Sequence, residues 1–84
     1  MRDRIWAKSH TLGRSEIRVF GRDHRPAHFH VLYPDGDALV DIVSLAVLRG
    51  TLPRRHRQDV LAWAALNRST LVAEWNRLNP DLPV

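Results

Sequence analysis

The sequence contains no cysteine, which excludes a disulfide framework and any metal site built from thiolates. It has no apolar run close to the roughly 20 residues that span a bilayer. Its first residues, Met1 to Trp6, also lack the apolar core of a signal peptide. We therefore expect a soluble, cytoplasmic protein. A chain of 84 residues buries only about 60% of its unfolded surface, so we expect one domain, residues 1–84, with a modest core.

Acidic residues and lysine are both scarce. The chain has 9 Asp and Glu against 13 Lys and Arg, a net charge of +4, and Lys8 is its one lysine. The planar fork of arginine suits phosphate and carboxylate oxygens. Excess positive charge favours an acidic partner, either nucleic acid or an acidic protein. A genome rich in G and C would produce the same arginine bias, so composition alone does not identify that partner.

Three of the 5 histidines, His24, His28 and His30, lie within one short stretch. From residue 28 to residue 33, polar and aromatic or β-branched side chains alternate, which predicts a strand. Successive side chains of a strand point to opposite faces, so His28 and His30 project together, about 7 Å apart along the backbone. His24 belongs to the polar connection, residues 21–27, that leads into this strand.

Further alternating segments predict strands at residues 4–12, 16–20 and 38–43, with a short fifth strand at 46–49. The sequence thus predicts an antiparallel β-meander of four or five strands over about residues 4–49. From Pro53 onward the apolar spacing is helical, which predicts helices at about residues 53–66 and 70–79. Ser69 is the predicted N-cap of the second helix. This is an α+β fold in which both helices pack on one face of the sheet.

The Asp35-Gly36 pair is a hairpin signal. A two-residue turn centred there would place His30 opposite Asp41 on the next strand. Arg18 would then lie near His30 on the other side. Arg18, His28, His30 and Asp41 would share one face, away from the helices. The prediction depends on register, because a slip of one residue would move these side chains to the other face.

Two segments resemble a known family. They are Asp-His-x-Pro-x-His-Phe-His-Val at residues 23–31 and Leu-Pro-x-Arg at residues 52–55. Together with Gly50, Val60, Trp63 and Trp75, they resemble the bacterial family called domain of unknown function 4160 (DUF4160). The resemblance covers about residues 17–78. The N-terminal strand fits less well, and Glu74 stands where the family pattern has Asn.

The resemblance implies a partner rather than a reaction. Members of the family are small bacterial proteins that are often encoded beside another short protein, an arrangement similar to toxin–antitoxin pairs. This implies a small partner protein, encoded nearby, and RNA as a further ligand. Our first hypothesis is therefore one component of a two-protein module that binds these ligands through the His/Arg face of the sheet. On this hypothesis the protein needs no cofactor.

The first alternative is a metal-independent ribonuclease. His28, His30 and His24 would take a proton from a ribose hydroxyl and give one to the leaving oxygen. The phosphate would be bound by arginines, and the candidates are Arg18, Arg22, Arg25 and Arg55. Asp23, Asp41 and Pro26 would support the histidines.

The second alternative is a zinc-binding hydrolase. His28 and His30 would present two imidazoles to one ion, and either His24 or Asp41 would complete a three-ligand site with an open position. The sequence does not decide between an enzyme and a binding module, and it gives no oligomeric state.

Overall fold

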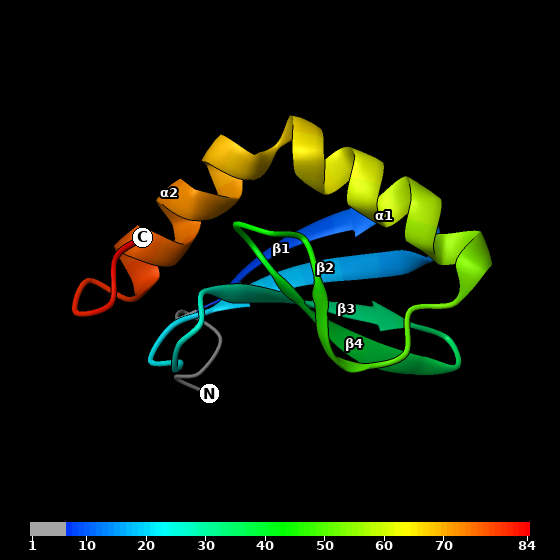
Figure 1. Ribbon diagram of the computed structural model, residues 1–84, viewed down its shortest axis with the longest axis horizontal. Coiled ribbons are helices and arrows are strands. Elements are labelled where there is room, and N and C mark those ends of the chain that lie inside the picture. Colours follow the sequence, from blue (N-terminus) through cyan, green and yellow to red (C-terminus); the bar gives the residue numbers. More distant parts are fainter. Residues whose placement is uncertain (1–6) are drawn as a thin grey trace.

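The computed structural model describes residues 7–84, which form a five-stranded sheet followed by two helices (Figure 1). The strands are β1 (Ala7–Leu12), β2 (Ser15–Phe20), β3 (His28–Tyr33), β4 (Gly36–Asp41) and β5 (Val47–Gly50). All neighbours are antiparallel, and their order in the sheet is their order in the chain. The helices are α1 (Arg54–Leu66) and α2 (Arg68–Leu78). The predicted α+β meander is confirmed, and residues 4–6 of the predicted first strand lie outside the described residues.

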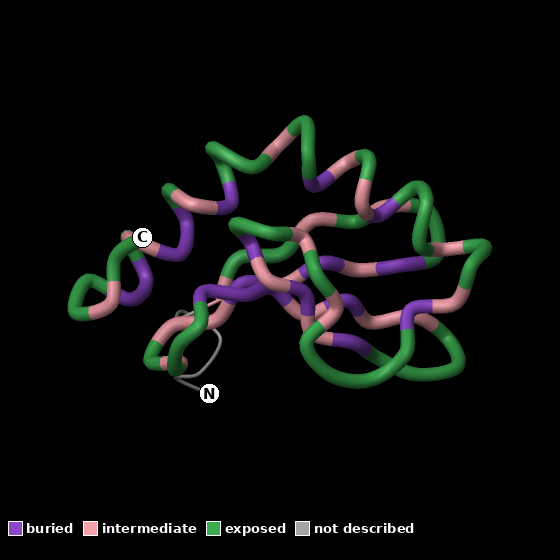
Figure 2. Tube along the Cα trace, viewed as in Figure 1, coloured by how far each residue is buried: buried purple, intermediate pink, exposed green. Residues whose placement is uncertain are grey.

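The core lies between one face of the sheet and the two helices, which are on the same side of it (Figures 1 and 2). Alternate strand residues and a stripe of each helix are apolar, so each element has one face to bury. The strands contribute Ile17, Val19, Phe29, Val31, Ala38 and Val40, and the helices contribute Val60, Ala64, Leu71 and Trp75. Burial of one such large side chain contributes about 1.5–3 kcal/mol. In residues 7–84, no helix has the length and apolar character needed to cross a membrane.

The pairing of β3 with β4 differs from the prediction. His28 lies opposite Asp41, and His30 lies opposite Leu39, so the predicted pair of His30 with Asp41 is wrong. The cause is the turn: Tyr33 pairs with Gly36, so Pro34 and Asp35 form the turn and Gly36 already belongs to β4. Proline suits the first central position of a turn because its φ is fixed. The register shifts by two residues, which preserves the alternation of faces.

The pairing of β2 with β3 agrees with the prediction, because Arg18 lies directly opposite His30. One row of paired residues therefore crosses the whole sheet. Its members are Ser9, Arg18, His30, Leu39 and Arg49, one from each strand in order. No helix within residues 7–84 covers this face.

The boundaries between the helices also differ from the prediction. The cap of α2 is Asn67 and the helix begins at Arg68, so the prediction of Ser69 as the N-cap is wrong. Asn67 ends α1 as well: its backbone N–H bonds to the carbonyl oxygens of Trp63 and Ala64. One residue therefore joins the two helices, and no separate loop is needed. Pro53 is the N-cap of α1 rather than its first helical residue.

Candidate metal centre

The connection between β2 and β3 brings Asp23 back against the first residues of β3. Oδ2 of Asp23 lies 3.1 Å from Nε2 of His28 and 3.6 Å from Nε2 of His30. These three atoms all lie within 4.8 Å of one another. Zinc bound tetrahedrally at its usual bond lengths holds its ligand atoms about 3.3 Å apart. The two distances from Asp23 are close to this spacing, and the three side chains together form a group that could hold one metal ion.

The hydrogen bonds of His28 decide what its Nε2 atom can do. Nδ1 of this buried ring lies 2.6 Å from the carbonyl oxygen of Pro26, so Nδ1 must carry the proton and donate it. In the neutral ring Nε2 then has only a lone pair, and this atom lies 3.1 Å from Oδ2 of Asp23. Histidine ligands of metals commonly donate their other ring N–H to a backbone carbonyl in this way. His28 therefore has the tautomer and support of a metal ligand.

His30 contributes a second nitrogen, which has no hydrogen-bond partner among residues 7–84. Its Nε2 atom is buried without a hydrogen bond, since 3.6 Å to Asp23 is too long for one. Burial and the neighbouring His28 lower the pKa of His30, although Asp23 opposes the shift. The neutral imidazole, which is the form that binds metal ions, is thereby favoured. The ring itself is fixed edge-on against Phe20, with 4.6 Å between ring centres.

Asp23 is held by groups on both sides. Its backbone N–H donates to Oδ1 of Asn79 at 2.8 Å, and its own Oδ1 accepts the backbone N–H of His24 at 2.9 Å. These two contacts leave Oδ2 facing the imidazoles. Sequence reasoning placed Asp23 in a supporting role, and it missed Asn79 because a lone Asn after a helix has no pattern to mark it.

His24 lies at the rim of this cluster. Its side chain is 73% exposed, and its Nε2 atom lies 3.6 Å from Oδ1 of Asp23. Nδ1 donates to the carbonyl oxygen of Arg25 at 3.1 Å. The three predicted histidines are therefore neighbours, but Asp23 occupies the third position that the sequence hypothesis gave to His24 or Asp41.

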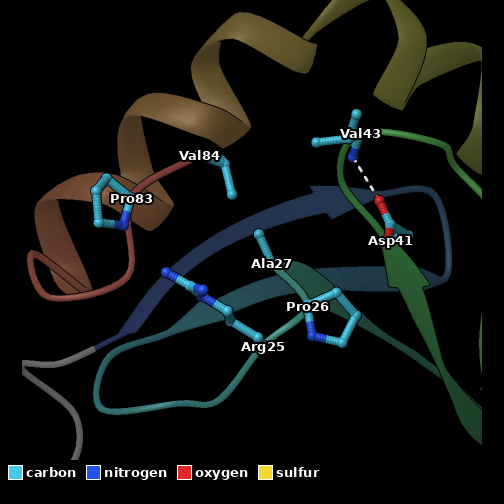
Figure 3. A pocket seen from close by; sticks show the side chains of 7 residues that line it. All are labelled: Arg25, Pro26, Ala27, Asp41, Val43, Pro83 and Val84. Carbon is cyan, nitrogen blue, oxygen red and sulfur yellow. Dashed lines mark hydrogen bonds between the residues drawn. The ribbon is translucent and has the colours of Figure 1, made fainter.

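Asp41 has a different task. Its Oδ1 atom accepts the backbone N–H groups of Val43 and Ser44, at 2.8 and 2.9 Å, and so holds the turn between β4 and β5. Figure 3 shows the contact with Val43 beside an open hollow that Arg25 and Pro26 also line. Asp41 lies opposite His28 in the pairing of β3 with β4, yet its carboxylate accepts hydrogen bonds from the backbone of the turn after β4.

The four predicted phosphate-binding arginines are not gathered at one place. Arg18 lies opposite His30 and pairs with Glu16 at 3.0 Å. Arg22 and Arg25 lie in the connection that carries Asp23. Arg55, on α1, pairs with Asp35 in the turn at the other end of β3. Arg55 therefore lies at the opposite end of β3 from Asp23 and His28.

Comparison with known protein families gives a match. The model of the family described as "Domain of unknown function (DUF4160)" matches residues 16–76. This range includes all three converging side chains and excludes Asn79. No curated protein and no solved structure matches the chain.

Proposed function

The chain belongs to the DUF4160 family, to which no activity is attached, and we propose from the geometry of its site that it binds a divalent transition metal ion. The ligands are Oδ2 of Asp23 and Nε2 of both His28 and His30. Two imidazoles and one carboxylate suit zinc, whereas magnesium and calcium prefer sites made of oxygen atoms.

One observation carries this proposal. The ring of His28 already donates through Nδ1, and its Nε2 atom lies 3.1 Å from a carboxylate oxygen. Two lone pairs at that distance repel each other unless a cation or a second ring proton lies between them. The Nε2 atom of His30, for which residues 7–84 provide no hydrogen-bond partner, lies 3.6 Å from the same carboxylate. A metal ion satisfies all three atoms at once, whereas one proton satisfies only one pair.

Three protein ligands leave at least one coordination position open to water or a substrate, as in catalytic rather than structural zinc sites. Zinc lowers the pKa of bound water to about 7, so hydroxide becomes available at neutral pH. The reaction class that this supports is hydrolysis. In that reaction Asp23 and the histidines hold the ion, and the Pro26 carbonyl orients the His28 ring.

A second candidate is binding without turnover. The row formed by Ser9, Arg18, His30, Leu39 and Arg49 crosses the face of the sheet opposite the two helices and carries two guanidinium groups. It favours a role in which this chain, as one part of a toxin–antitoxin-like module, binds a small partner protein and RNA. Glu16 and Asp37 are on the next row, so the charge of this face is mixed, and we rank this candidate second.

The test is a calorimetric titration of the metal-free, untagged protein with Zn²⁺. The parent is expected to bind one ion per chain, and Asp23→Ala and His30→Ala are expected to abolish that binding. His56→Ala is the matched control, because His56 lies on α1 beside Tyr33 and Ser15. A parent that binds no zinc, or variants that bind it as the parent does, would contradict the proposal. Cleavage of RNA by the metal-free parent would instead support the ribonuclease alternative.

A further inference from the structure

Asn79 lies just beyond the end of α2, and we infer that it is a positioning residue of the metal centre. This inference rests on the proposed function and extends it to a residue far from the ligands in the sequence. Through Asn79 the last turn of α2 would set the direction of the Asp23 carboxylate.

The side chain of Asn79 joins three parts of the chain. Only 4% of the residue is exposed. Its Oδ1 atom accepts the backbone N–H of Asp23 at 2.8 Å. Its Nδ2 atom donates to the carbonyl oxygen of Phe20 at 2.9 Å and to that of Trp75 at 3.2 Å. The end of β2, the connection that carries Asp23 and the last turn of α2 therefore meet on one amide group.

This arrangement needs an amide. Oδ1 must accept a hydrogen bond while Nδ2 donates two, and among side chains of this size only Asn does both. Aspartate would keep the acceptor but lose the donors. Leucine would remove all three side-chain hydrogen bonds from the Asp23 N–H and the carbonyl oxygens of Phe20 and Trp75, although the Trp75 oxygen would still accept the backbone N–H of residue 79. The amide group of Asn79 is therefore suited to hold the connection at residues 21–27 against the end of α2.

The same turn of α2 supports a second ligand. The indole ring of the buried Trp75 lies 5.5 Å from the ring of His28, and its Nε1 atom donates to the carbonyl oxygen of Leu82. Trp75 thus packs against His28, while Asn79 fixes Asp23. Both contacts come from the C-terminal end of α2. The separation between the Asp23 carboxylate and the His28 imidazole therefore depends on how α2 packs against the sheet.

Outer contacts of this kind typically change metal affinity by 10–100-fold when removed. A purely structural Asn would change stability and leave the coordination of the metal as it was. The two roles therefore differ in a spectroscopic property. Cobalt(II) is a suitable probe, because its absorption depends on coordination geometry.

The experiment compares the parent with Asn79→Ala and Asn76→Ala. Asn76 is the matched control, since it lies on the same helix and its side chain bonds to the backbone of Val84. Zinc affinity and the cobalt(II) spectrum are measured, with circular dichroism as the check of folding. We expect Asn79→Ala to bind zinc 10–100-fold more weakly and to shift the cobalt(II) spectrum. Asn76→Ala should match the parent in both.

Parent affinity together with a parent spectrum in Asn79→Ala would overturn the inference. If Asn79→Ala does not fold, hydrogen exchange of the parent decides: zinc should slow exchange of the Asp23 amide, and an unchanged rate would overturn it. A parent that binds no metal is a separate outcome. It contradicts the proposed function itself and removes this inference with it.

Discussion

Nε2 of His28 lies 3.1 Å from Oδ2 of Asp23, and the opposite nitrogen of the same ring donates to the carbonyl oxygen of Pro26. These two contacts of His28 join the start of β3 to the connection that precedes it. The contact places a ring lone pair against a carboxylate, and His30 brings a second buried nitrogen to the same point.

Zinc should stabilise the folded chain. A ligand that binds only the folded state at 100 times its Kd contributes about 2.7 kcal/mol. In a domain of this size 1 kcal/mol corresponds to about 4–8 °C in Tm. We therefore expect zinc to raise the melting temperature of the parent by about 10–20 °C. Thermal denaturation followed by circular dichroism measures this shift. His30→Ala should show none, and a shift of equal size in that variant would place the ion elsewhere.

Asp41 should matter for stability and not for metal binding. Its carboxylate accepts two backbone N–H groups of the turn after β4, so Asp41→Ala should cost about 1–3 kcal/mol. Asp41→Asn keeps an acceptor oxygen and should cost less. Urea denaturation gives both values. If Asp41→Ala weakened zinc binding beyond what its stability explains, Asp41 would belong to the metal centre after all.

His10 and Glu74 should act as a pair. Nε2 of His10, on β1, lies 3.0 and 2.9 Å from the two carboxylate oxygens of Glu74, a buried residue of α2. His10→Ala leaves that carboxylate without its partner and should destabilise the protein by about 1–3 kcal/mol. Replacing both residues by apolar ones should cost less than the sum of the single changes. A double-mutant cycle in urea tests this coupling, and strict additivity would contradict it.

Substitution of Gly50 by alanine should lower the free energy of unfolding more than the same substitution of Gly13. Both have a left-handed backbone, with φ of +78° and +61°. A Cβ atom at Gly50 would lie 2.5 Å from the carbonyl oxygen of Asp37, whereas nothing lies within 4 Å of one at Gly13. We expect about 1–2 kcal/mol for Gly13→Ala, from backbone strain alone. For Gly50→Ala we expect about 2–5 kcal/mol, because a steric clash is added. Equal losses in chemical denaturation would refute this ranking.

The strands and helices were predictable because their apolar residues repeat at fixed periods. The alternation from His28 to Tyr33 placed both histidines on one strand, and the family resemblance is confirmed over residues 16–76. The exact pairing was not predictable. Pro34-Asp35 and Asp35-Gly36 are both acceptable turns by their residue types, and the choice between them decided whether His28 or His30 lies opposite Asp41.

The site itself was only partly predictable. Its histidines stood out in the sequence, but the role of Asp23 depends on how the connection at residues 21–27 folds back, and no periodicity governs such a segment. Asn79 is 56 residues from the Asp23 amide that it binds. Glu74 is 64 residues from His10, and only the three-dimensional contact shows that the two side chains pair. These are contacts between distant segments, which residue types at fixed spacing do not encode.

The most direct measurement is anomalous diffraction at the zinc absorption edge from crystals of the zinc-loaded protein. The account predicts one ion about 2.0–2.2 Å from Nε2 of His28, Nε2 of His30 and an oxygen of Asp23, with water completing its coordination. An anomalous map without a peak between these three side chains, or with zinc bound only at other histidines, would contradict it.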